Sequence, residues 1–131
     1  MCIRDRHGGL PLYRVSPSLH QIMRGGKFIF LPDVGEFLSY INNATYIVTD
    51  SFHGTAFSIN FNKQFIEILP NTKTGSRNQS ILQLTGLQDR IVTDYNDFSI
   101  ATKMIDYTFV NGIIKEERKK SYCILKRIIE E

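Results

Sequence analysis

Residues 50–54, which read Asp-Ser-Phe-His-Gly, bring together the side chains of this sequence that are best suited to chemistry. His53 can act as a general acid and as a general base, because an imidazole exchanges its proton near neutral pH. Ser51 and the backbone of Gly54 can add hydrogen bonds to a ligand, since glycine lets a ligand approach the main chain. Asp50 is a poor partner for an anion, so we expect it to orient His53 or to cap a following helix. From the residues alone, a catalytic role and a purely structural role for His53 are equally open. In the structural role, His53 would be hydrogen-bonded within its own turn.

The segments on either side of this polar stretch predict a strand, a tight turn and a helix. Residues 46–49 are β-branched and aromatic, as expected of a buried strand, and residues 55–59 form an apolar run of roughly helical length. Ligands of open α/β sheets bind at the carboxyl ends of strands. A helix N-terminus there presents free N–H groups and a positive dipole end, which favour an anion. The pattern therefore places His53 in a candidate anion-binding turn.

Two further apolar runs, residues 27–31 and 64–69, predict buried strands, and a proline closes each of them. Asp33 and Glu36 have the spacing of a capping box at the start of a helix that ends at residues 42–43. The apolar face of this helix comprises Val34, Phe37, Leu38 and Ile41. The alternation of strands and helices favours an α/β fold, a Rossmann-like parallel sheet with flanking helices.

Residues 70–77 form the one long polar loop of this predicted fold. The loop follows the third strand directly, so it should overhang the same edge of the sheet as His53. It carries two cations, Lys73 and Arg77, which a lid could bring to an anionic ligand. On composition alone, a solvated surface loop is the stronger interpretation.

The rest of the chain is predicted to be mainly helical. A short helix is expected to start at Ser16, and later elements are expected as helices over residues 78–87, 97–104 and 111–129 and an edge strand over residues 89–92. The last helix carries a stripe of Val110, Ile113, Ile114, Ser121, Ile124, Leu125 and Ile128. On its other side Glu116 and Lys120 have the spacing of an i,i+4 pair. His7 and His20 have no neighbours at catalytic or ligand spacing, and we expect them to be loop residues.

The composition of the 131-residue chain argues against several classes of protein. A net charge of +3 without a long basic stripe does not favour nucleic-acid binding. Cys2 and Cys123 lie at opposite ends of the chain, which indicates neither a disulfide framework nor a zinc site and favours a reduced, cytosolic setting. No cluster of acidic residues and histidines has metal-ligand spacing, and no apolar run approaches the length of about 18 residues that spans a bilayer.

Residues 50–58 resemble the signature of the polysaccharide pyruvyl transferase family. Further similarities follow in order along the chain, at Pro32, Glu36, Phe37 and Leu38, at residues 62–65, at Arg77, at Leu82, Gly86, Leu87, Asp89 and Arg90, at Ile105, Asp106 and Tyr107, and at Ser121. The resemblance covers most of residues 27–131 and implies a GT-B-like enzyme with two Rossmann-like halves. Residues 7–131 would be its C-terminal domain, with the N-terminal half of the enzyme as a partner. We expect residues 1–6 to be a sequence artefact joined to a truncated chain.

The resemblance implies that a pyruvyl group moves from phosphoenolpyruvate to a sugar of a cell-surface polysaccharide or its precursor, forming a ketal. His53 would be the catalytic acid and base, and Lys73 and Arg77 would bind the donor's phosphate and carboxylate, with Ser51 and Gly54 adding hydrogen bonds. No cofactor or metal is required. The acceptor would be a saccharide or a lipid-linked saccharide, and the reaction would be cytoplasmic, with the inner face of the membrane as one place for it.

Two other functions remain open at this point. One is the donor half of a GT-B-like glycosyltransferase that uses a nucleotide sugar. Such a half usually has a glycine-rich turn for the pyrophosphate, whereas Gly75 stands alone here and no G-x-G-x-x-G motif follows a strand. The other is a non-catalytic α/β domain that binds an anion or packs against a partner.

Overall fold

The strands of the chain pair in parallel, as the sequence predicts. The computed structural model describes residues 9–19, 22–23, 25–69 and 75–130. Its contacts divide the chain into two compact units, Met1–Ala44 and Thr45–Glu131. The strands of the described residues form two parallel sheets of two strands each. The chain is therefore a mixed α/β protein, and the larger Rossmann-like sheet of a GT-B half stays a prediction.

The first unit contains the strands β1 (Tyr13–Ser16) and β2 (Lys27–Phe30) and the helix α1 (Val34–Asn43). The strands are paired in register from Tyr13 opposite Lys27 to Ser16 opposite Phe30. The helix expected to start at Ser16 is wrong, because Ser16 ends a strand whose partner lies far along the sequence. His7 and His20 lie outside the described residues.

The capping box at the start of α1 is confirmed. The Asp33 carboxylate accepts the Glu36 N–H at 2.8 Å, and the Glu36 carboxylate accepts the Asp33 N–H at 3.1 Å. Ile41 is buried as expected, but Val34 is 75% exposed. A helical side chain covers the turn that precedes its own residue, and Val34 opens the helix, so it has no such turn to pack on.

The second unit begins with the predicted strand, turn and helix. Strand β3 (Tyr46–Thr49) leads into helix α2 (Phe52–Asn60), which returns the chain to strand β4 (Gln64–Glu67). The two strands are parallel, from Tyr46 opposite Gln64 to Thr49 opposite Glu67. This βαβ arrangement is confirmed, and it places the C-terminal residues of both strands at the same sheet edge.

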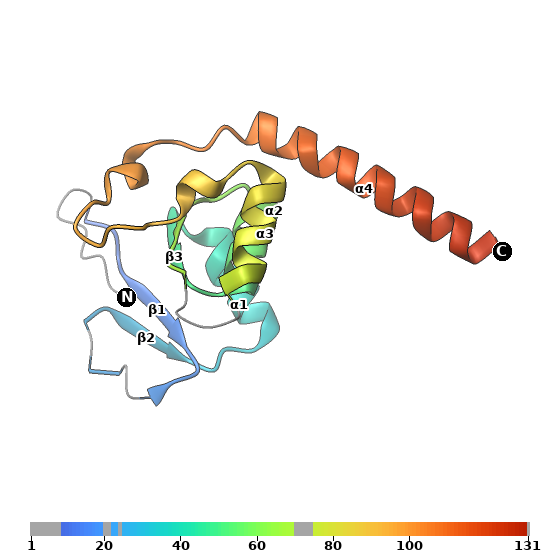
Figure 1. Cartoon of the computed structure of the whole chain (residues 1–131). Coiled ribbons are helices and arrows are strands. Elements are labelled where there is room, and N and C mark those ends of the chain that lie inside the picture. The colour runs from blue at the N-terminus through green and yellow to red at the C-terminus, as the bar shows by residue number, and fades with distance from the viewer. Residues whose placement is uncertain (1–8, 20–21, 24, 70–74, 131) are drawn as a thin grey trace. The chain divides into compact units, whose positions relative to one another are not determined.

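Helix α3 (Gly75–Thr85) starts earlier than the sequence predicts and packs against α2 (Figure 1). Its first turn is polar, which is why residues 75–77 looked like loop. The expectation of a loop is wrong for Arg77, which lies in the first turn of α3. The other residues of the predicted loop, 70–74, lie outside the described residues.

The segment after α3 is less regular than predicted. Gly86 has a φ of 72°, and the Leu87 N–H donates to the Leu82 carbonyl at 2.7 Å, so the helix ends in a Schellman-type turn. The predicted strand 89–92 is instead the 3-10 turn η2 (Gln88–Arg90) followed by a single bridge between Ile91 and Glu67. The predicted helix 97–104 is reduced to a 3-10 turn, η3 (Ser99–Thr102).

The terminal helix α4 (Tyr107–Glu130) starts before the predicted position. The Asp106 carboxylate accepts the Thr108 N–H at 2.9 Å, so it satisfies a first-turn donor. Val110 is buried, but the rest of the predicted stripe is not, and Ile124, Leu125 and Ile128 are exposed. Lys120 pairs with Glu117 at 2.6 Å rather than with Glu116. No helix in the described residues has the length and apolar character needed to span a membrane.

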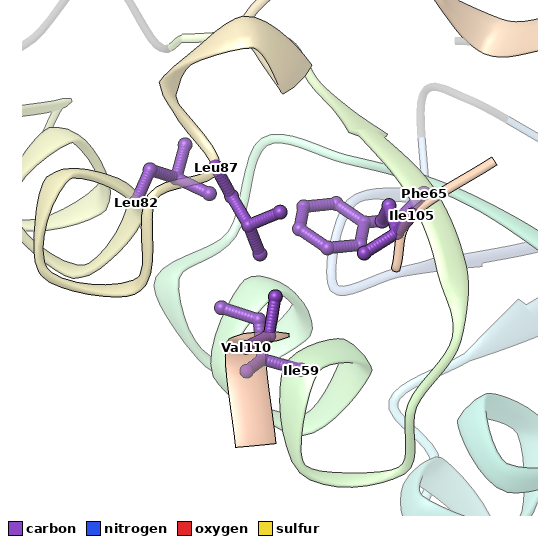
Figure 2. Close-up of a cluster of buried hydrophobic side chains, with 6 residues drawn as sticks. All are labelled: Ile59, Phe65, Leu82, Leu87, Ile105 and Val110. Atoms are coloured by element: carbon purple, nitrogen blue, oxygen red, sulfur yellow. The ribbon is translucent and has the colours of Figure 1, made fainter. Parts of the chain in front are cut away.

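One hydrophobic cluster joins the elements of the second unit (Figure 2). It consists of Ile59, Phe65, Leu82, Leu87, Ile105 and Val110. These side chains come from the end of α2, from β4, from the second half of α3 and the turn after it, and from residues 105–110 at the start of α4. Their burial packs the three helices against β4.

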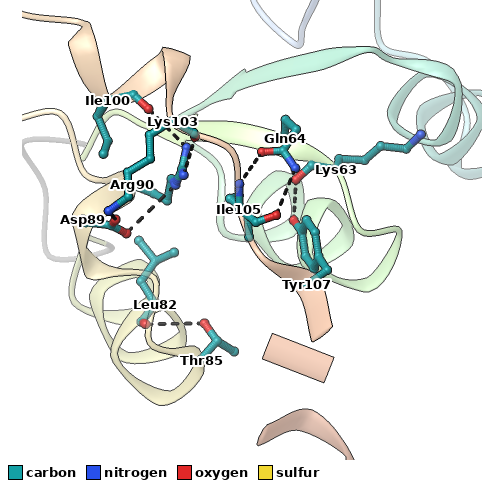
Figure 3. A network of polar contacts seen from close by, with 10 residues as sticks. All are labelled: Lys63, Gln64, Leu82, Thr85, Asp89, Arg90, Ile100, Lys103, Ile105 and Tyr107. Atoms are coloured by element: carbon teal, nitrogen blue, oxygen red, sulfur yellow. Dashed lines mark hydrogen bonds and ion pairs between the residues drawn. The ribbon is translucent and has the colours of Figure 1, made fainter. Parts of the chain in front are cut away.

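Polar contacts join residues 100–107 to β4, to the residue before it and to η2 (Figure 3). The Gln64 side chain accepts the Ile105 N–H at 2.7 Å. The buried Arg90 donates to the Ile100 carbonyl at 3.2 Å and to the Lys103 carbonyl at 2.5 Å. The Tyr107 hydroxyl donates to the Lys63 carbonyl, and burial raises the pKa of this hydroxyl above its usual range.

The capping box provides a test of the first unit. Asp33→Ala removes an N-cap acceptor, which should lower the free energy of unfolding by about 1 kcal/mol. Asp33→Ser keeps a cap and should lose less. Urea unfolding of the full chain, followed by helical circular dichroism, measures both. Equal stabilities of Asp33→Ala and the wild type would contradict a stabilising cap.

Candidate functional site

The turn between β3 and α2 presents His53 at the start of a helix. Ser51 is the N-cap: its hydroxyl accepts the Gly54 N–H at 3.4 Å, and its carbonyl accepts the Thr55 N–H at 2.9 Å. Across the described part of the chain, the N–H groups of Phe52 and His53 have no acceptor. The His53 side chain is exposed. The turn thus offers two backbone donors and an imidazole to a ligand at the positive end of a helix.

Gly54 is required by the packing of this turn. The Thr49 hydroxyl accepts the Ser51 N–H at 3.1 Å, which brings the strand end close to the helix. A Cβ atom at position 54 would overlap the Thr49 hydroxyl. Gly54 is buried, so its missing side chain makes room for Thr49. Ligand contacts of Ser51 and Gly54 stay predictions.

The structure brings Arg77 to the same turn. Its guanidinium carbon lies 5.6 Å from the centre of the Phe52 ring, and the His53 ring lies 5.9 Å from that ring in an edge-on arrangement at 78°. Phe52 therefore contacts both the imidazole and the cation. Arg77 is exposed and forms no ion pair with any residue in the described ranges, so its charge is available to an anion.

Three residues of this site were not assigned to it from the sequence: Phe52, Glu67 and Asn78. An aromatic residue between Ser51 and His53 was the available signal for Phe52, since aromatic faces attract guanidinium groups. Nothing local indicated Glu67 or Asn78, because they meet only in the folded unit.

Glu67 is the last residue of β4, and its carboxyl group is completely buried. The Thr55 hydroxyl and the Asn78 side-chain amide both donate to it. Burial raises the pKa of the Glu67 carboxyl group, and the charge of Asp50 adds to this, whereas the hydrogen bonds from Thr55 and Asn78 act in the opposite direction.

Asp50 contributes through its main chain. Its carbonyl accepts the Asn78 side-chain N–H at 3.4 Å, and its own side chain is exposed. The helix cap is Ser51, so the expectation that Asp50 caps the helix is wrong. Its other expected role, orienting His53, stays a prediction. Lys73 lies outside the described residues.

Two further observations concern metal ligands and hollows in the described residues. Within the residues that the structure describes, no three acidic, histidine or cysteine side chains are grouped so as to hold a metal ion. A hollow of about 230 Å³ lies away from His53, where the end of α2 meets α4. It is lined by Asn60, Asn62, Asn111, Ile114, Lys115 and Arg118.

The fold and the turn together define an α/β protein with a histidine and an arginine beside a helix N-terminus. Residues 11–72, slightly less than half of the chain, match the model of the polysaccharide pyruvyl transferase family, which supports the resemblance seen in the sequence. The matched segment contains the whole of the His53 turn. It also contains β1, which lies before the part of the sequence that carries the resemblance. No curated protein and no solved structure matches the chain. The family describes transferases that place pyruvyl groups on polysaccharides.

The contact between Gly54 and Thr49 gives a first test of the site. Gly54→Ala should lower the free energy of unfolding by about 1–3 kcal/mol, because the new methyl group overlaps the Thr49 hydroxyl. Thr49→Ala should make the same change less costly, whereas Thr49→Ser, which keeps the hydroxyl, should not. Urea unfolding of the single and double variants measures the coupling. If Gly54→Ala were more stable than the wild type, the close contact between position 54 and the Thr49 hydroxyl would be contradicted.

The buried carboxyl group of Glu67 gives a second test. Because its pKa is raised on folding, the folded state holds this proton more tightly than the unfolded chain. The stabilising effect is present below the ordinary pKa of 4.5 and is lost as the pH rises through the folded value. Glu67→Gln lacks this titration. Wild-type stability should therefore fall relative to Glu67→Gln as the pH rises above 4.5, by at most about 1.4 kcal/mol per pH unit.

Unfolding by urea at a series of pH values measures this difference. Asp97→Asn serves as a control, because Asp97 is exposed and its pKa is lowered by hydrogen bonds from Ser99. Because the pKa of Asp97 is lowered, the wild type should gain stability relative to Asp97→Asn as the pH rises. This trend is opposite to the one expected for Glu67→Gln. A constant difference between wild type and Glu67→Gln from acid to neutral pH would contradict the raised pKa.

Proposed function

We propose that the chain takes part in pyruvyl transfer from phosphoenolpyruvate to two hydroxyl groups of a saccharide, forming a cyclic ketal. The family match supports the reaction class. The observation that carries the proposal is that Arg77 and His53 both lie close to the Phe52 ring, at the start of α2. These groups are a cation, a proton carrier and free backbone donors, which together suit a small dianionic donor.

Binding of the donor requires positive charge and N–H donors, because phosphoenolpyruvate carries a phosphate and a carboxylate. We assign one anionic group to Arg77 and to the N–H groups of Phe52 and His53. Lys73 is the second cation of the proposed site. Ser51 retains its role as the helix cap and can offer its hydroxyl to the ligand as well.

The chemistry requires an acid and a base. The methylene carbon of the donor takes a proton, which makes the adjacent carbon electrophilic, and two acceptor hydroxyl groups then bond to that carbon as phosphate leaves. The hydroxyl groups release two protons: one replaces the proton delivered to the methylene carbon, and the other leaves with the phosphate. His53 is exposed and can perform both transfers in sequence, first as an acid and then as a base.

Donor binding can be tested on the full chain by titrating phosphoenolpyruvate and following backbone amide shifts by NMR. Shifts should concentrate at residues 51–55 and 75–78. Arg77→Ala should weaken binding about tenfold or more, because a charged hydrogen bond is lost. Arg127→Ala, which removes an exposed arginine near the end of α4, is the matched control and should leave binding unchanged.

Two outcomes would contradict donor binding at this turn: equal weakening by Arg77→Ala and Arg127→Ala, or shifts that avoid residues 51–55. Titration with UDP and GDP separates this proposal from nucleotide-sugar transfer. A stronger response to either nucleotide than to phosphoenolpyruvate would favour a glycosyltransferase.

The catalytic role of His53 needs a separate measurement. Phosphate release from phosphoenolpyruvate is followed in the presence of a panel of methyl hexosides, with ketal products detected by mass. Loss of a general acid–base should reduce turnover about 100-fold or more in His53→Ala, with donor binding largely kept. Unchanged turnover in this variant would exclude His53 as the acid and base.

A further inference from the structure

The carboxyl group of Glu67 connects three parts of the candidate site. Glu67 is the one acidic residue of the described ranges that is fully buried. The two groups that donate to it come from different helices: Thr55 belongs to the first turn of α2, and Asn78 belongs to the first turn of α3. A buried carboxyl group with partners on two helices restrains the distance between them.

The two partners extend these contacts to the turn before α2. The Thr55 hydroxyl also lies 3.0 Å from the Ser51 carbonyl, and the Asn78 amide also lies 3.4 Å from the Asp50 carbonyl. Residues 50 and 51 lead directly into His53. Arg77 directly precedes Asn78. The network therefore ends next to both side chains that the proposed function uses.

We propose that Glu67 is a positioning residue, which fixes the first turns of α2 and α3 to each other and so keeps Arg77 beside Phe52 and His53. The inference builds on the proposed function, because that function gives Arg77 and His53 their roles. The Glu67 side chain is fully buried and is hydrogen-bonded to Thr55 and Asn78, so it acts through these two residues.

The hydrogen atoms of this network are consistent with a neutral carboxyl group. A hydroxyl group has one hydrogen, so while Thr55 donates to Glu67 it cannot also donate to the Ser51 carbonyl. If the Glu67 carboxyl group is neutral, its own O–H can donate to Thr55 instead, and both contacts of Thr55 are then hydrogen bonds. The other carboxyl oxygen accepts from Asn78. A glutamine can reproduce this pattern, with its N–H group toward Thr55 and its oxygen toward Asn78. Glu67→Gln should therefore preserve the site, whereas Glu67→Ala removes both connections.

The contact between Arg77 and Phe52 supplies a direct readout that needs no ligand. Protons of a side chain that lies over an aromatic ring are shifted in the NMR spectrum by the ring current. Phe52→Leu gives the Arg77 shifts without a ring. We expect Glu67→Gln to keep the wild-type shifts and Glu67→Ala to move them toward those of Phe52→Leu.

A matched control separates positioning from general destabilisation. Val110→Ala removes buried side-chain volume from the core of the same unit without touching the network, and it should keep the wild-type Arg77 shifts. If Glu67→Ala does not fold, Asn78→Ala removes the connection to α3 alone and should move the Arg77 shifts in the same way. Wild-type shifts in a folded Glu67→Ala or Asn78→Ala variant would overturn the inference, as would equal displacement in Val110→Ala.

The outcome is independent of donor binding. If wild type fails to bind phosphoenolpyruvate but Arg77 leaves Phe52 in Glu67→Ala, the proposed function fails and the positioning role stands. If wild type binds the donor but Arg77 stays in place in the variants, the proposed function survives and the positioning role is wrong.

Discussion

The second unit depends on one constraint, which is that a buried polar group must be hydrogen-bonded. Glu67 lies at the carboxyl end of β4 with its side chain fully covered. Its partners are Thr55 of α2 and Asn78 of α3, so the first turns of both helices approach this point. One carboxyl group thus joins the first turns of both helices, which carry His53 and Arg77.

A second close contact acts at the same place. The Thr49 hydroxyl accepts from the Ser51 backbone where a Cβ atom at Gly54 would otherwise stand. The glycine that seemed suited to ligand approach is thus explained first by the packing of a strand against a helix. With Ser51 as its cap, the helix begins at Phe52 and projects His53 toward solvent.

Sequence patterns correctly predicted the elements that depend on residues close to one another in the chain. The capping box at Asp33, the β-branched strand before Asp50 and the helix after it depend on residues close in sequence, and the structure contains all three. Strand β1 and the start of α3 were missed, because a strand partner distant in the sequence and a polar first helical turn leave no apolar pattern. For the same reason the sequence predicted Arg77 to be a loop residue. It also gave no indication that the Asn78 side chain bonds to Glu67.

The extent of the family match also bears on the site. The match ends at residue 72, before Arg77 and Asn78, although it includes His53 and Glu67. The hydrogen bond from Asn78 to Glu67 joins the matched segment to α3, and the contact of Arg77 with Phe52 lies across the same boundary. Because Asn78 lies directly after Arg77 on one helix turn, a change at Glu67 inside the match is transmitted to a cation outside it. The proposed site therefore extends over β3, α2, β4 and the first turn of α3, and the matched segment contains only part of it.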